Sequence, residues 1–192
     1  MAKKKVERGE LLAATERLLV EKGYDGFNFS LLSERLGVGR STLYDHFSNK
    51  DDLIAAYMTD AMDRIITACE RLRAEADALQ QIKGMITIFH AHSQIHQIVQ
   101  LIPALKNAGA ASEKVARALL GVQEDHQKLA GLLSEACEKA KQQNAIRQGV
   151  PTAMIAALLF QSVLLPNPQG LSTELWSEQV FDLLYHGLHE AK

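Results

Sequence analysis

The chain has 192 residues, of which 47% are hydrophobic and 23% charged, and its formal net charge is −2. This composition is that of a soluble globular protein. The start, "MAKKKVERGELL", lacks the apolar run of a signal peptide, and the longest apolar stretch, "MIAALLF", is too short to span a bilayer. Cys69 and Cys137 have neither CxxC nor disulfide-framework spacing. We therefore expect a cytoplasmic protein with no membrane segment.

Charge is unevenly placed along the chain. Residues 1–50 hold nine Lys/Arg and seven Asp/Glu, whereas residues 51–192 hold twelve and sixteen. A basic end on an acidic body suggests two functional parts.

The apolar spacing predicts helices throughout, and no segment alternates as a strand would. Gly23 and Gly37 should end the first two helices, and Ser30, Ser48 and Asp77 should cap the second, fourth and fifth. The predicted helices are 6–22, 31–36, 40–46, 49–76, 78–95, 112–143, 151–165 and 173–190.

Two short helices with a very tight connection, 31–36 and 40–46, are typical of a helix-turn-helix. A helix that enters the major groove needs apolar anchors inside and small or polar side chains outside. Leu43 and Phe47 would be the anchors. The expected outer face holds Arg40, Ser41, Thr42, Asp45 and His46. The alternative is a helical hairpin whose polar face is merely solvated.

The segment "LLVEKGYDGFNFSLLSERLGVGRSTLYDHFSNKDDL" resembles the N-terminal domain of the TetR family of transcriptional regulators. The resemblance covers about a quarter of the chain. It implies an all-α fold of about nine helices and no enzymatic activity. Residues 1–48 would form a helix-turn-helix DNA-binding domain, and 49–192 a larger helical effector-binding and dimerisation domain.

The resemblance also implies roles for individual residues in binding double-stranded DNA. Arg40 and Thr42 would face the groove, with Arg40 placed for guanine readout. The residues expected to contact DNA are Ser30, Arg40, Ser41, Thr42, Tyr44, His46 and Lys50. Position 39 is Gly, where the family commonly has a capping Ser or Thr. Tyr44 has a second interpretation as a core aromatic.

A basic arm precedes the first helix, formed by Lys3, Lys4, Lys5 and Arg8. Such an arm can enter a minor groove or follow phosphates, or it can be a solvated tail.

The last two helices should form a homodimer, as the resemblance implies. Both are apolar on more than one face, which indicates burial against more than one neighbour. A monomeric core is the alternative. The expected interface residues are Ile155, Leu158, Leu159, Ser162, Trp176, Phe181 and Leu184.

The middle of the chain should bind a small-molecule effector, and an aromatic, acyl or drug-like compound suits apolar residues better than a sugar phosphate. The candidate lining residues are Met62, Ile66, Met85, Phe89, His92, His96 and Leu105. Each could equally be plain core. His92 and His96 are four residues apart, so a metal-binding sensor or enzyme is an alternative. We expect no cofactor.

The sequence thus predicts a dimeric repressor that binds a palindromic operator and is released by its effector. Two rival interpretations are a metal-dependent helical enzyme and a protein-interaction adaptor with a degenerate N-terminal domain.

Overall fold

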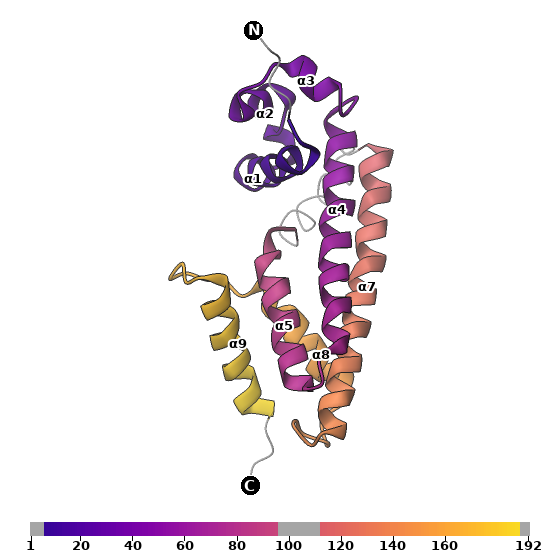
Figure 1. Ribbon diagram of the computed structural model, residues 1–192, viewed down its shortest axis with the longest axis vertical. Coiled ribbons are helices and arrows are strands. Elements are labelled where there is room, and N and C mark those ends of the chain that lie inside the picture. The colour runs from indigo at the N-terminus through magenta and orange to yellow at the C-terminus, as the bar shows by residue number, and fades with distance from the viewer. Residues whose placement is uncertain (1–5, 96–111, 189–192) are drawn as a thin grey trace. The chain divides into compact units, whose positions relative to one another are not determined.

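The computed structural model describes residues 6–95 and 112–188, and every element in these ranges is helical (Figure 1). The prediction of an all-α fold is confirmed. The elements are α1 (Arg8–Gly26), α2 (Phe29–Leu36), α3 (Arg40–Tyr44), α4 (Lys50–Arg71), η1 (Leu72–Ala74), α5 (Ala78–Ala91), α7 (Glu113–Gln142), α8 (Thr152–Gln161), η2 (Ser162–Leu164) and α9 (Thr173–Leu188). None of the described helices is long and apolar enough to cross a membrane.

The chain divides into two compact units. Among the described residues, the first unit consists of residues 6–62, 94–95 and 112–123. The second unit holds Asp63–Ser93 and the chain from Glu124 onward. Helices α4 and α7 therefore each contribute residues to both units.

In the first unit, α1 buries an apolar face that includes Leu11, Leu18 and Leu19. Gly23 has φ 66 and ψ 179, a conformation that favours glycine. The regular helix ends there, as predicted, and a further turn follows as far as Gly26.

Helix α2 is capped by Asn28, whose Oδ1 accepts from the Leu31 N–H at 3.0 Å. The prediction of Ser30 as the cap was wrong. Helix α2 begins at Phe29, whose side chain is buried, so Ser30 lies inside the first turn. Gly37 ends the helix in the left-handed region, with φ 63 and ψ 40, as predicted.

Helix α3 is short and ends at Tyr44 rather than at residue 46. Its anchors lie inside, as predicted, since Leu43 and Phe47 are both buried. Helix α4 begins at Lys50. Its cap is Asn49, whose Oδ1 accepts from the Asp52 N–H at 2.9 Å, so the prediction of Ser48 was wrong.

In the second unit, Asp77 caps α5 as predicted, with Oδ1 accepting from the N–H groups of Leu79 and Gln80. Helix α5 packs against α9 and also contacts η1, α8 and η2 (Figure 1). Cys69 and Cys137 are free and buried, and burial raises the pKa of each thiol to about 12. Both thiols are therefore uncharged packing groups at neutral pH.

Candidate DNA-binding site

Helix α3 and the turn after it present a polar outer face. Arg40, Ser41, Tyr44 and His46 are all exposed, and the Tyr44 side chain is 57% exposed. The anchors Leu43 and Phe47 point the other way, into the core of the first unit. This is the two-faced arrangement that entry into a groove requires.

Thr42 does not belong to this outer face, contrary to the prediction. Its side chain is 5% exposed, and its Oγ1 has no hydrogen-bond partner among the described residues. Thr42 directly precedes Leu43, and on so short a helix both neighbours fall on the inward side. We therefore correct its assignment as a groove-facing residue.

Arg40 is positioned by a residue of the preceding helix. Its Nη1 donates to Ser30 Oγ at 3.3 Å, and both side chains are exposed. The bond connects the start of α2 with the start of α3. The predicted pair therefore lies together, and Ser30 restricts the orientation of a guanidinium group that would otherwise sample many rotamers.

Tyr44 is anchored through its ring and exposed through much of its surface. The Tyr44 and Phe29 ring centroids are 5.1 Å apart with a tilt of 59°. Phe29 is buried, so the contact fixes Tyr44 on the outside of α2. The interpretation of Tyr44 as a core aromatic is wrong, because most of the side chain faces solvent.

Lys50 points toward the end of α1 rather than standing out with Arg40. Its Nζ donates to the Tyr24 carbonyl oxygen at 3.2 Å and lies 4.2 Å from the centroid of the Tyr24 ring. The side chain is half-buried. The structure thus gives Lys50 an internal partner, which the sequence did not indicate.

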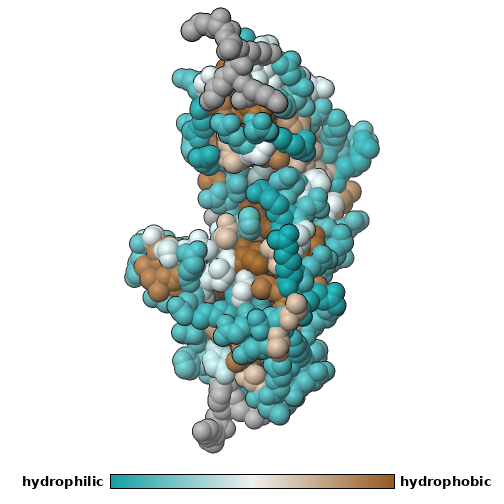
Figure 2. All heavy atoms as spheres, viewed as in Figure 1, coloured by the Kyte–Doolittle hydropathy of each residue, from teal (hydrophilic) through white to brown (hydrophobic). Residues whose placement is uncertain are grey.

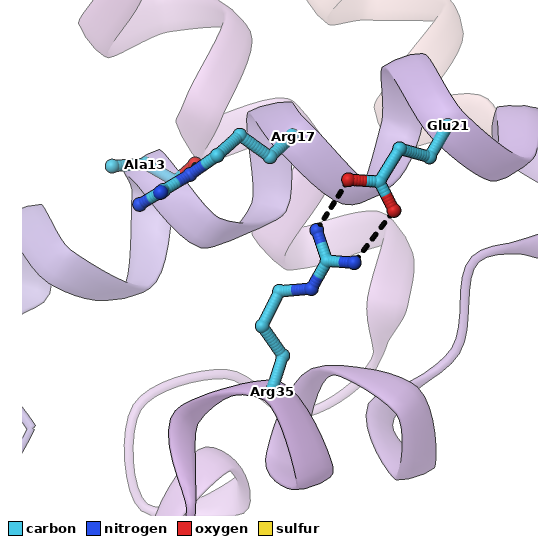
Figure 3. A network of polar contacts seen from close by, with 4 residues as sticks. All are labelled: Ala13, Arg17, Glu21 and Arg35. Atoms are coloured by element: carbon cyan, nitrogen blue, oxygen red, sulfur yellow. Dashed lines mark hydrogen bonds and ion pairs between the residues drawn. The ribbon is translucent and has the colours of Figure 1, made fainter.

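An ion pair that the sequence did not reveal joins α1 to α2 (Figure 3). Arg35 donates from Nη1 and Nη2 to the two carboxylate oxygens of Glu21, at 2.7 and 2.5 Å. The hydrogen bond lowers the pKa of Glu21 and raises that of Arg35. The pair is exposed, so its contribution to stability is small, but its bidentate geometry fixes the angle between the helices.

Arg8 is the part of the basic arm that the structure describes, and Lys3, Lys4 and Lys5 lie outside the described residues. The Arg8 guanidinium carbon is 5.5 Å from the Phe47 ring centroid, and the side chain is exposed. The cation–π contact holds a positive charge beside the turn between α3 and α4.

The candidate effector residues are mostly in the core. Met62, Met85 and Phe89 are buried, whereas Ile66 and His92 are half-buried. His96 and Leu105 lie outside the described residues.

An aromatic cluster in the second unit surrounds one of these candidates. The Phe89 and Phe160 centroids are 5.2 Å apart, and those of Phe160 and His126 are 5.8 Å apart. Phe160 was not predicted for this region, because a contact between helices this distant in sequence leaves no local pattern.

No group of three or more His, Cys, Asp or Glu side chains placed for a metal ion occurs within residues 6–95 and 112–188. His92 ends α5, and its proposed partner His96 is outside these ranges.

His90, which the sequence did not single out, makes the buried polar contact of α5. Its Nε2 is 3.2 Å from the Ser162 carbonyl oxygen, and its Nδ1 is 2.9 Å from Ser177 Oγ. The carbonyl can only accept, so Nε2 carries the proton of the neutral ring. Burial lowers the pKa of His90, although the bond to Ser162 opposes this. The ring therefore joins α5 to η2 and α9 in its neutral form.

Most of the predicted dimer residues pack inside the second unit. Ile155, Leu159, Ser162 and Phe181 are buried, whereas Trp176 and Leu184 are half-buried. Of the predicted set, Leu158 is the residue that stands out, at 49% exposed. These four buried residues have little surface left for a partner, and the dimer interface stays a prediction.

Besides Leu158, other apolar side chains between the start of α8 and the end of α9 are exposed. Hydrophobic atoms are visible at the surface where the chain leads into α9 (Figure 2). We call these residues the α8–α9 apolar face. They are Met154, Leu158, Leu164, Leu165, Leu175 and Leu183.

Residues 11–57 match the family described as bacterial regulatory proteins, tetR family. The matched range contains α2, α3, the turn between them and the exposed residues Arg40, Ser41, Tyr44 and His46. This segment is therefore similar to the N-terminal domain of the tetR family of bacterial regulatory proteins. The matched family is one of bacterial regulatory proteins.

Two relatives of known role are similar in sequence. The HTH-type transcriptional activator FasR of Mycolicibacterium smegmatis is 30% identical over 83 residues, which are 43% of this chain and 38% of that protein. The fatty acid metabolism regulator protein of Bacillus subtilis is 22% identical over 200 residues, covering 98% of this chain and 99% of that protein.

Solved structures share the fold along nearly the whole chain. The ketosteroid regulator KstR2 of Mycobacterium tuberculosis superposes with a TM-score of 0.75 at 15% identity, covering 98% of this chain and 97% of that one. AibR in complex with isovaleryl coenzyme A and operator DNA has a TM-score of 0.66 at 20% identity, with coverages of 93% and 98%. The TetR-like fold therefore extends beyond the N-terminal domain.

Proposed function

We propose that this protein is a TetR-family repressor that binds a palindromic operator as a homodimer and releases it when a small effector binds. Residues 1–48 would read the DNA, and residues 49–192 would bind the effector and the second subunit. Because operator DNA is its partner, we assign the protein to the cytoplasm.

The observation that carries the proposal is the exposed face of α3. Arg40, held by Ser30, and Tyr44, held by Phe29, stand on the solvent side of a helix whose other side is buried. Arginine can donate two hydrogen bonds to guanine O6 and N7 in the major groove. In this proposal Tyr44, Ser41, His46 and Ser30 contact phosphates or base edges around that pair.

Phosphate binding by an acidic protein needs only local positive charge. Arg8 and Arg40 lie near or on the DNA-facing side, and two-fold symmetry would double them. Few phosphates are neutralised per domain in this arrangement, so we expect a shallow dependence of operator affinity on salt.

Selection of bound sites from random double-stranded DNA tests the proposal directly. We expect a two-fold symmetric consensus whose half-sites are about one helical turn apart. Wild-type protein that enriches no sequence would contradict it. An asymmetric consensus would contradict the proposed dimer while leaving DNA binding intact.

The α8–α9 apolar face supports the proposal of a homodimer. Exposed leucines on neighbouring helices form a surface that monomers seldom leave in water. Two copies related by a two-fold axis would cover this face with its own counterpart.

For the effector, we propose an acyl compound such as an acyl thioester. The name of one relative refers to fatty acid metabolism, and one structural neighbour was solved in complex with isovaleryl coenzyme A. The buried candidates Met85 and Phe89 are apolar, as an acyl chain requires. Adding isovaleryl and palmitoyl coenzyme A to the operator complex, with free coenzyme A as the control, tests this. Release by neither thioester would exclude both as effectors.

A further inference from the structure

Two consecutive carboxylates in the first turn of α4 bind different parts of the first unit. Asp51 accepts from the Tyr24 hydroxyl at 2.6 Å, and Tyr24 lies at the end of α1. Asp52 accepts from Lys114 Nζ, also at 2.6 Å, and Lys114 lies in the first turn of α7. The start of α4 is thus bonded to α1 on one side and to α7 on the other.

Tyr24, near the end of α1, contacts the start of α4 and the residue that precedes α7. Its side chain is buried and its carbonyl oxygen accepts from Lys50, the first residue of α4. Its hydroxyl meets Asp51 and the backbone of Ser112, which directly precedes α7. Burial and the neighbouring carboxylate raise the pKa of Tyr24, so the hydroxyl keeps its proton and remains a donor.

The partner from α7 is held in place by that helix's own cap. Ser112 Oγ accepts from the Val115 N–H at 3.4 Å. Helix α7 begins at the next residue, Glu113, so Lys114 is its second residue. The Asp52 side chain is only 16% exposed, whereas that of Lys114 is 62% exposed. A largely buried carboxylate without its cation would be costly, so the ion pair restrains the two helix starts relative to each other.

We propose that Tyr24, Asp52 and Lys114 are positioning residues for DNA recognition, which set the orientation of α3 by bonding the ends of α1 and α7 to the first turn of α4. Only residues 45–49 separate α3 from α4, so the direction of that first turn determines how α3 is presented. The start of α7 then affects the recognition helix as directly as α4 does. This inference rests on the proposed DNA-binding function.

Lys114→Glu tests the proposal, and the chain offers a matched control. Lys128 pairs with Asp125 at 2.7 Å, and both residues lie in α7. The two side chains are 64% and 18% exposed, which is close to the 62% and 16% of Lys114 and Asp52. Lys128→Glu makes the same change in charge without affecting the junction. Lys114→Arg keeps the cation and should behave as the wild type.

Operator affinity and backbone hydrogen exchange would be measured on all three variants and on Tyr24→Phe. We expect Lys114→Glu to lose about fivefold in affinity, and Tyr24→Phe, which removes a hydrogen bond to a charged group, about tenfold or more. The slope of affinity against salt should stay at the wild-type value, because no phosphate contact is removed. Exchange in residues 40–53 should accelerate in both variants and remain unchanged in Lys128→Glu.

Equal behaviour of Lys114→Glu and Lys128→Glu in both measurements would overturn the proposal. A reduced salt slope in Lys114→Arg or Tyr24→Phe would overturn it too, since it would indicate an altered phosphate contact. If the wild type binds no DNA, the proposed function fails. Hydrogen exchange on the free protein would then still decide whether the junction positions α3.

Discussion

Two polar regions of this protein have opposite environments. On α3, Arg40, Tyr44 and His46 are exposed, and the contacts made by Arg40 and Tyr44 leave much of each side chain in solvent. In the second unit, His90 is buried and both ring nitrogens have partners, Ser177 and Ser162. The first region keeps donors available for another molecule, whereas the second uses its donors within the fold.

This difference in exposure separates residues available to bind another molecule from residues that hold the fold together. Exposed donors held in place by neighbours, as Arg40 is by Ser30, can exchange water for DNA at little cost in ordering. His90, whose partners are both internal and far from α3 in the sequence, stabilises the elements that it joins. Mutations in the first region should therefore change DNA affinity at constant stability, and mutations in the second should do the reverse.

The largest effect is expected from Leu158→Glu, which extends the comparison to the α8–α9 apolar face. Each copy would bring an unpaired carboxylate into the proposed interface, so the dimer should dissociate about 100-fold more readily. Light scattering over a dilution series measures this. Leu120→Glu is the control, because Leu120 is similarly exposed but lies on α7. Equal dissociation of both variants would contradict the proposed interface.

Arg40→Ala should have the second largest effect. Each of two domains would lose a base contact of about 1–3 kcal/mol, so operator affinity should fall about 30-fold or more while the melting temperature stays constant. Fluorescence anisotropy measures the affinity. Arg17→Ala is the control, because Arg17 is exposed on α1 and its Nε donates to the Ala13 carbonyl within the same helix (Figure 3). A similar loss in both variants would show a general charge effect.

His90 should make stability depend on pH. Its folded pKa is lowered by burial, so protonation favours the unfolded state. The stabilisation should be complete above about pH 6.5, the unfolded pKa, and should be lost as the pH falls below it. Chemical denaturation at pH 7.5 and 5.5 would show a lower free energy of unfolding at pH 5.5. His90→Gln should remove this decrease without affecting operator affinity at pH 7.5, and a decrease that persists would contradict the assignment.

Tyr44→Phe should have the smallest effect. The ring contact with Phe29 stays, and only the hydroxyl is removed. Operator affinity should fall about 2- to 10-fold for each of the two domains, the value of one neutral hydrogen bond. The salt slope should not change, because a hydroxyl neutralises no phosphate. An unchanged affinity would show that the exposed hydroxyl does not contact DNA.

The sequence predicted the first unit well because its signals are local. Gly23 and Gly37 adopt the positive φ that ends each helix segment, and Leu43 and Phe47 follow the inward spacing of α3. The caps of α2 and α4 were misplaced, because Ser and Asn are nearly equal in cap preference. The burial of Phe29, a tertiary contact, decided where α2 begins.

The second unit was less predictable because its helices are apolar on several faces. Periodicity could not distinguish Ile155 and Leu159, which are buried, from Leu158, which is exposed. Nothing in the segment "FHAHSQIH" indicated that His90 would bond Ser162 and Ser177, which are 72 and 87 residues away. Such contacts depend on helix packing and leave no pattern in the sequence.

The most direct test of DNA reading by α3 is a base-pair scan of the selected operator with wild type and Arg40→Ala. Affinity for each single base-pair substitution would be measured in both proteins. We predict that Arg40→Ala loses discrimination at one guanine in each half-site and keeps it elsewhere. A uniform loss of affinity, with discrimination retained at every position, would contradict the assignment of Arg40 as the residue that reads the groove.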